Sequence, residues 1–122
     1  MMSDDEMINT GFISFCAACF LRKGGNPETN PILSPLIAPD FLVGKLPRTH
    51  MLVCEIDGLR DQGIAMALRM KKANCSVQLH NYGDFIHGFC NFDNGSLGVK
   101  EFSRATVNII AHMRQMLELP PH

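Results

Sequence analysis

The sequence lacks three features that would each point to a particular environment. It has no excess of basic residues, since 11 Lys and Arg stand against 12 Asp and Glu. It has no run of about 20 apolar residues, the length that spans a bilayer; the longest apolar stretch covers residues 11–21. Its N-terminus carries Asp4, Asp5 and Glu6 where a signal peptide needs positive charge. These absences argue against nucleic-acid binding, a transmembrane segment and secretion, and they predict a soluble, cytoplasmic protein.

The composition is that of a globular chain, with 46% hydrophobic and 19% charged residues in a length of 122. This length suits one domain or part of one. The cysteine count, five, is odd, which argues against a disulfide framework. Cys16 and Cys19 form a C-x-x-C motif, but Phe15 and Phe20 flank them and no second Cys/His pair has the spacing of a zinc finger. We expect these two cysteines to be buried as packing residues.

The first half of the chain predicts a tail, a helix and a long connection. Residues 1–10 are acidic and are expected to form a loosely held tail. Apolar residues between 12 and 20 predict a helix, with Arg22 and Lys23 in its last turn and a Gly-Gly pair ending it. Residues 26–47 hold five of the seven prolines and predict an irregular connection whose apolar residues cover a neighbour.

The second half predicts two strands alternating with two helices. Residues 50–56 form a short apolar run that is typical of a buried strand, and residues 77–82 alternate like a second strand. Between them, Asp61 is expected to cap a helix that Asn74 closes. A loop should follow over residues 83–98. The last helix is predicted from one apolar face, made of Phe102, Thr106, Ile109, Met113 and Met116.

This order predicts an α/β fold, with two parallel strands and flanking helices in the order α, loop, β, α, β, α. A strand–helix–strand unit gives a parallel pair, which is normally buried on both faces within a larger sheet. Two strands are too few for a receiver-like or flavodoxin-like domain, which has about five. The architecture therefore predicts the end of a larger domain.

Two polar residues follow the predicted strands, Asp57 after the first and His87 in the loop after the second. Parallel strands bring their C-terminal ends to the same edge of the sheet, where catalytic groups gather. An aspartate that accepts the Nδ1–H of a histidine leaves Nε2 free to act as a general base. Asp84 is an alternative partner for His87, although a turn-stabilising role suits it better. The spacing alone is weak evidence for catalysis.

The residues around this pair resemble the hormone-sensitive lipase family of α/β-hydrolases. The matching segments are S-P-L-I-A-P-D at 34–40, L-P at 46–47, C-E-I-D-G-L-R-D at 54–61 and H-G-F at 87–89. The resemblance covers roughly residues 30–117, so residues 11–122 are expected to form the C-terminal part of such a domain.

The resemblance implies that Asp57 is the acid and His87 the base of a catalytic triad. It places Ser34 in a structural segment and makes Asp61 the second aspartate of the family motif. Gly58 departs from the proline usual in the family and loosens the turn. The nucleophile motif G-x-S-x-G and the H-G-G oxyanion motif are absent, and Ser96, in N-G-S-L-G, is expected to be a loop or capping serine.

Two hypotheses for function follow. The chain is the C-terminal segment of a serine carboxylic-ester hydrolase, a lipase or esterase that acts on esters or acylglycerols and needs no metal or organic cofactor. Alternatively it is a non-catalytic fragment, or an interaction module that binds a partner chain carrying the rest of the sheet. Self-association through the exposed sheet edge is also expected. Lacking the nucleophile, the chain alone is expected to be inactive.

The other histidines receive ordinary interpretations. His50 and His80 are expected on the solvent side at strand ends, and His112 on the polar side of the last helix.

Overall fold

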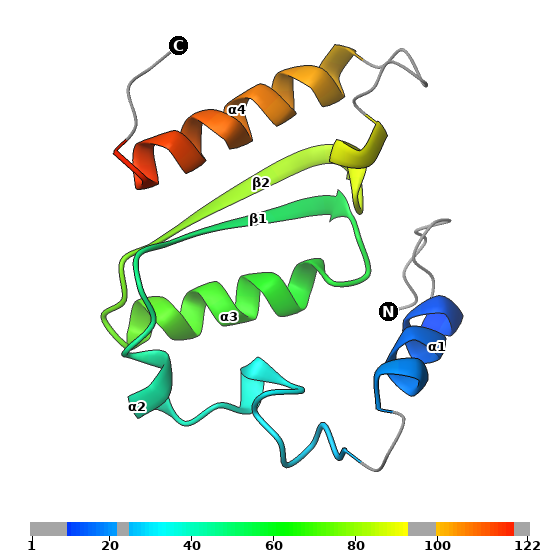
Figure 1. Ribbon diagram of the computed structural model, residues 1–122, viewed down its shortest axis with the longest axis vertical. Helices are drawn as coiled ribbons and strands as arrows, with labels where there is room; N and C mark the ends of the chain where they lie inside the picture. Colours follow the sequence, from blue (N-terminus) through cyan, green and yellow to red (C-terminus); the bar gives the residue numbers. More distant parts are fainter. Residues whose placement is uncertain (1–9, 22–24, 93–99, 119–122) are drawn as a thin grey trace.

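The computed structural model describes residues 10–21, 25–92 and 100–118. Over these residues a two-stranded sheet lies between two helices, with α3 on one face and α4 on the other (Figure 1). The elements are, in order, α1 (Thr10–Phe20), η1 (Pro35–Ile37), α2 (Asp40–Val43), β1 (Thr49–Ile56), α3 (Arg60–Lys72), β2 (Val77–Ile86), η2 (Phe89–Phe92) and α4 (Lys100–Met116). The predicted order of α1, β1, α3, β2 and α4 is confirmed, but the connection predicted to be irregular contains η1 and the short helix α2. The expected acidic tail falls almost wholly on residues outside this description.

The two strands are parallel, as predicted, and their register is regular from Thr49 opposite Val77 to Cys54 opposite Tyr82. It then shifts, so that Ile56 pairs with Ile86. Four residues of β2 therefore advance against two of β1, which defines a bulge. The prediction that the second strand ends near Tyr82 was wrong, because the strand continues through this bulge to Ile86.

The face of the sheet toward α3 is packed closely through a glycine. A Cβ atom at Gly63 would lie 2.8 Å from Cγ1 of Val53, so the missing side chain allows α3 to approach β1. The apolar residues buried on the sheet, on α3 and on α2 are Val53, Ala67, Met70 and Val43.

The start of α3 differs from the prediction. Asp61 lies inside the first turn, and the residue at the N-cap position is Leu59, which makes no capping bond through its side chain. The Oδ1 atom of Asp57 instead accepts the backbone N–H of Leu59 at 2.8 Å. The end of the helix is as expected: Asn74 has a positive φ of 61°, and the N–H of Cys75 bonds the carbonyl of Met70.

The sheet face toward α4 is apolar at one end and carries histidines at the other. Toward the C-terminal ends of the strands lies an apolar cluster, made of Cys54, Phe89, Phe102 and Ala105 with Tyr82, Phe85, Ile86 and Ile109 packed against it. Burial, with nearby Cys90 and Cys54 as lesser causes, raises the pKa of Tyr82. Toward the N-terminal ends lie three histidines. Met113, expected on the inner face of α4, is 56% exposed.

The interpretation of His50, His80 and His112 as solvent-side residues was wrong. Their rings gather between the sheet and α4, with centroids 4.1–5.3 Å apart. Burial lowers the pKa of His50, with His112 and Arg48 as further causes, and burial lowers that of His80, with His112 and His50 as further causes. The periodic apolar positions of α4 did not reveal this, because a polar residue replaces an apolar one on the inner face.

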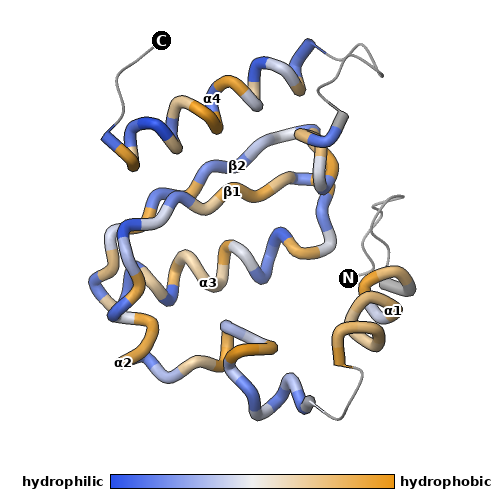
Figure 2. The backbone as a smooth tube through the Cα atoms, in the orientation of Figure 1, coloured by the Kyte–Doolittle hydropathy of each residue, from blue (hydrophilic) through white to orange (hydrophobic). Residues whose placement is uncertain are grey.

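The first helix was predicted, but it ends at Phe20 with no basic residue in its last turn, and Arg22, Lys23 and Gly24 lie outside the described residues. Its burial also differs from the prediction. Figure 2 shows that α1 is apolar over much of its length, and Phe15 and Phe20 are 65% and 74% exposed. Cys16 and Cys19 are exposed and unpaired, so the expectation that they are buried is wrong. The physical reason is that, within the described residues, no sheet or helix covers the outer side of α1.

The connection before β1 is held to α3 by one arginine. Arg69 donates hydrogen bonds to the carbonyl oxygens of Leu36 and Ala38 and forms an ion pair with Asp40. The guanidinium fork can make these bonds at once, whereas a lysine ammonium cannot match their geometry. This side chain fixes the proline-rich segment beneath the sheet.

We expect the substitution Arg69→Lys to loosen this segment. Losing one charge-assisted hydrogen bond removes about 1.5 kcal/mol, which corresponds to a roughly tenfold increase in local opening. Limited chymotrypsin digestion measures this as faster cleavage at Phe41, which is 64% exposed. The matched control is Arg104→Lys on the exposed side of α4. An unchanged cleavage rate in Arg69→Lys would show that other contacts hold the segment.

Candidate active site

The sheet register places Asp57 and His87 side by side. Ile56 and Ile86 are paired, so the next residue of each strand leaves the sheet at the same edge. Nδ1 of His87 lies 2.8 Å from Oδ2 of Asp57. The expectation that the two side chains meet at the C-terminal edge of adjacent parallel strands is therefore confirmed.

The carboxylate of Asp57 is held through both oxygen atoms. Oδ2 faces the ring of His87, and Oδ1 accepts the backbone N–H of Leu59. The Asp57 side chain is only 10% exposed, and that of His87 is 40% exposed. The loosening expected from Gly58 is thus opposed by an Asx-type turn that orients the carboxylate. The sequence did not predict that Leu59 donates a hydrogen bond to Asp57, because almost any residue has a backbone N–H and no residue type marks this donor.

The turn after β2 explains why glycine and phenylalanine follow His87. Gly88 has a positive φ of 70°, a conformation that suits glycine. The turn buries Phe89, which is 4% exposed and lies with its ring centroid 4.7 Å from that of Phe85. His87 therefore stands on a turn that is anchored in the aromatic cluster.

The other candidate residues lie apart from this pair. Asp84 is exposed, lies in the β2 bulge and has a φ of 61°, and the carboxylate beside Nδ1 of His87 is that of Asp57. Ser34 precedes the short η1 turn, in agreement with a structural segment. Asp61 makes an ion pair with Arg60. Ser96 lies outside the described residues.

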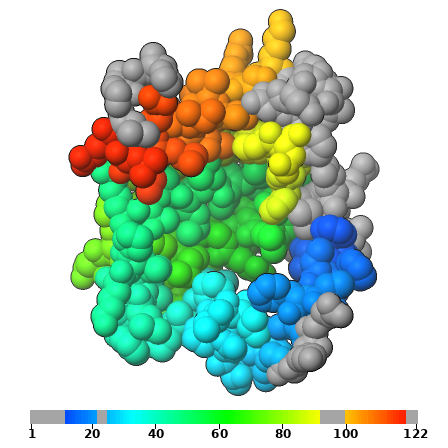
Figure 3. Space-filling model, viewed as in Figure 1, coloured from blue at the N-terminus to red at the C-terminus, as the bar shows by residue number. Residues whose placement is uncertain are grey.

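An apolar hollow of about 520 Å³ opens beside His87. Its lining comes from α1, the connection after it and the turn before α3, and consists of Phe12, Ile13, Cys16, Ala17, Phe20, Leu21, Pro27, Leu33, Leu59 and His87. In the space-filling view, α1 (blue) and the segment after it (cyan) lie together at one corner of the molecule (Figure 3). The volume falls in the usual range of small-molecule pockets. The sequence did not reveal that α1 lies near His87.

Comparison of the chain with known proteins identifies its family. A profile described as alpha/beta hydrolase fold matches residues 1–91, about three quarters of the chain. The chain belongs to the alpha/beta hydrolase fold family. Among curated members, neutral cholesterol ester hydrolase 1 of Rattus norvegicus is 41% identical over 71 residues, which cover 55% of this chain. Hormone-sensitive lipase of Bos taurus is 31% identical over 91 residues, which cover 75% of it. The resemblance to the hormone-sensitive lipase group is confirmed.

Solved hydrolase structures agree with the fold. An esterase from Pyrobaculum calidifontis matches 92% of this chain with a TM-score of 0.72 and 25% identity, and carboxyl esterase 2 from Tuber melanosporum matches 89% with a TM-score of 0.74 and 27% identity. The match covers 34% and 35% of those chains. The sequence matches cover only 17% of neutral cholesterol ester hydrolase 1 and 12% of hormone-sensitive lipase. The two strands with their helices are therefore one part of the α/β-hydrolase fold.

No helix among the described residues is both long and apolar enough to cross a membrane.

Proposed function

We propose that Asp57 and His87 supply the acid and base of a serine carboxylic-ester hydrolase. The observation that carries this proposal is the 2.8 Å contact between Nδ1 of His87 and the Asp57 carboxylate, at a strand edge beside an apolar hollow. This is the relation that a hydrolytic triad requires of its acid and base. The names of the relatives, esterases and lipases, support the same reaction class.

In this reaction a serine hydroxyl outside the 122 residues attacks the ester carbonyl. Nε2 of His87 takes the hydroxyl proton, and a tetrahedral intermediate forms. The proton then passes from His87 to the leaving alcohol, and an acyl-enzyme remains. Water attacks the acyl-enzyme with His87 again as base, which releases the acid and restores the serine. Asp57 holds the Nδ1–H tautomer and stabilises the imidazolium in both steps.

The substrate class follows from the hollow beside His87. Apart from the imidazole and the thiol of Cys16, its lining is hydrocarbon. Such a lining suits the apolar portion of an ester, from short-chain acyl esters to acylglycerols. The exposed cysteines Cys16 and Cys19, which form no disulfide, suit a reducing compartment, so a cytoplasmic location fits this proposal.

Transplantation of the segment tests the proposal. Residues 30–117 would replace the structurally matching segment of the Pyrobaculum calidifontis esterase, which supplies the rest of the fold. We expect the chimera to hydrolyse p-nitrophenyl esters. In it, Asp57→Asn and His87→Gln should lower kcat/KM by on the order of 10³–10⁴.

The matched control is Asp84→Asn in the same chimera. Asp84 is exposed, and asparagine tolerates its positive φ, so activity should stay within about twofold. An active, folded chimera that keeps its rate in His87→Gln would refute the assignment of the base.

A second candidate function is a non-catalytic interaction module. It is favoured by the sheet edges, which carry no third strand among the described residues. The two functions predict different chemical reactivity and a different association state for the 122-residue chain.

A further inference from the structure

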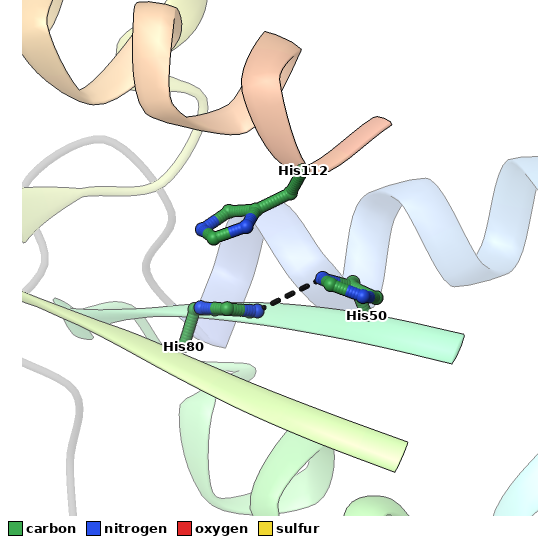
Figure 4. A group of neighbouring side chains, drawn as sticks. All are labelled: His50, His80 and His112. Carbon is green, nitrogen blue, oxygen red and sulfur yellow. Dashed lines mark hydrogen bonds between the residues drawn. The ribbon is translucent and has the colours of Figure 1, made fainter. Parts of the chain in front are cut away.

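Three of the five histidines meet at the end of the sheet opposite the candidate active site. His50 comes from β1, His80 from β2 and His112 from α4, and their rings face one another between the sheet and the helix (Figure 4). His50 precedes Asp57 by seven residues along an extended strand, which corresponds to roughly 23 Å. The cluster is therefore remote from the triad pair and takes no part in the reaction proposed above.

The strand register explains the approach of the first two rings. His80 pairs with Leu52, so His50 is its diagonal neighbour on the same face of the sheet. Nε2 of His80 lies 3.1 Å from Nδ1 of His50. The His112 ring lies over the His80 ring, with centroids 4.1 Å apart. One nitrogen from each of the three residues can be chosen so that all lie within 4.8 Å of one another.

These distances approach those of a metal site. Imidazole nitrogens bind Zn²⁺ at about 2.0–2.1 Å, which places two ligands of a tetrahedral ion about 3.3 Å apart. The His50–His80 pair, at 3.1 Å, is already close to this value. A contact of 4.8 Å must shorten by about 1.5 Å to reach it, and the partly stacked rings must turn so that one nitrogen lone pair of each points at the ion.

The donor set of the cluster restricts the kind of ion it can bind. The three neighbouring nitrogens belong to neutral or protonated imidazoles, and Nδ1 of His50 and Nε2 of His80 face each other. Three imidazoles without a carboxylate suit a borderline transition metal, whereas Mg²⁺ and Ca²⁺ prefer oxygen ligands.

We propose that His50, His80 and His112 bind one Zn²⁺ ion, with water in the fourth position. Because the three ligands come from β1, β2 and α4, the ion ties the C-terminal helix to the sheet. An ion bound only by the folded chain stabilises the fold by mass action. The site is thus a structural link, independent of ester hydrolysis.

Equilibrium dialysis of the full chain tests this site. After removal of any affinity tag and treatment with chelator, the chain is dialysed against ZnCl₂ at pH 7.5. We expect one Zn²⁺ per chain, a melting temperature that rises with the Zn²⁺ concentration, and reversal of both by EDTA. Co²⁺ substitution should give the intense visible absorption of a four-coordinate ion.

Glutamine variants identify the ligands. His80→Gln and His112→Gln should each weaken Zn²⁺ binding at least tenfold and lose the thermal shift. His87→Gln, which removes a histidine at the other end of the sheet, should keep both. Circular dichroism checks that each variant is folded, and the Co²⁺ spectrum of the unsubstituted chain gives a measurement that needs no variant.

The proposal fails if the unsubstituted chain binds no Zn²⁺ at 100 μM. It also fails if the Co²⁺ spectrum is that of a six-coordinate ion, or if folded His80→Gln and His112→Gln variants bind as tightly as His87→Gln. In any of these cases the three rings are a packed polar cluster without a metal.

Discussion

Incubation of the 122-residue chain with a fluorophosphonate probe should leave every serine unlabelled, and p-nitrophenyl butyrate should be hydrolysed no faster than in buffer. The reason is that the sequence contains the proposed base, His87, but no serine in a nucleophile motif. G-x-S-x-G does not occur, and the nearest match, N-G-S-L-G at residues 94–98, begins with Asn94. A phosphonate adduct requires a serine whose proton is taken by a correctly placed histidine.

The oxyanion donors are a second reason for inactivity. The H-G-G motif, which is the oxyanion motif of the family that the sequence resembles, is absent from these 122 residues. Each such donor is typically worth 10²–10³ in rate. His87 and Asp57 alone can activate water only weakly. Ester hydrolysis by the chain should therefore not be detectable above the rate in buffer.

The controls for this prediction are a complete family esterase and two serine variants. The esterase should label fully under the same conditions. If the chain labels stoichiometrically, Ser34→Ala and Ser96→Ala identify the serine, and the result shows that the chain contains its own nucleophile. That outcome would favour an independent enzyme and overturn the assignment of an external serine.

The parts of the site that could be predicted are those determined by local pattern. The alternating residues of β2 and the apolar run of β1 define two strands, and parallel strands end at one edge. Asp57 follows the first predicted strand directly and His87 lies in the loop predicted after the second, so the pattern places both residues at one edge of the sheet without fixing their contact. The family motifs then identified the same pair from a separate signal.

The parts that could not be predicted depend on contacts between distant segments. The bulge at Gly83 and Asp84 extends β2 to Ile86, and without it His87 would leave the sheet elsewhere. A glycine within a strand pattern is a known bulge signal. The sequence gives no equivalent signal for the Leu59 donor or for the neighbour of α1, because each depends on where another segment packs.

The histidine cluster is a second feature that could not be predicted, because it also depends on contacts between distant segments. His50, His80 and His112 are 30 or more residues apart in pairs, and each has an ordinary interpretation alone. Their proximity arises because a diagonal strand pair lies under the second half of α4. Spacing rules for metal motifs look for ligands paired a few residues apart along the chain, so they do not detect three histidines that come singly from three elements.

The isolated chain should self-associate at micromolar concentration. It exposes large apolar side chains, including Leu68 on α3 at 55% and Phe20 on α1 at 74%. Both strands are also edge strands among the described residues. Exposed edges template pairing, and apolar patches strengthen it.

Analytical ultracentrifugation can distinguish the sheet from the helix as the contact. Leu52 is 39% exposed on β1, and Phe20 is exposed on α1. If the sheet edge is the contact, Leu52→Lys should raise the monomer fraction severalfold, since a charge on an edge strand opposes pairing. Phe20→Glu, the matched change on the helix, should then have a smaller effect.

The reverse order of effects would make α1 the contact and remove the support for a sheet-edge interaction module. A compact monomer with a cooperative transition above about 60 °C, near the top of the usual mesophile range, would contradict both forms of the prediction. Such stability would require that the two-stranded sheet and its helices bury enough apolar surface by themselves to offset the chain entropy lost on folding. The described part of the chain has eight buried apolar residues in its core, and we expect that these do not suffice.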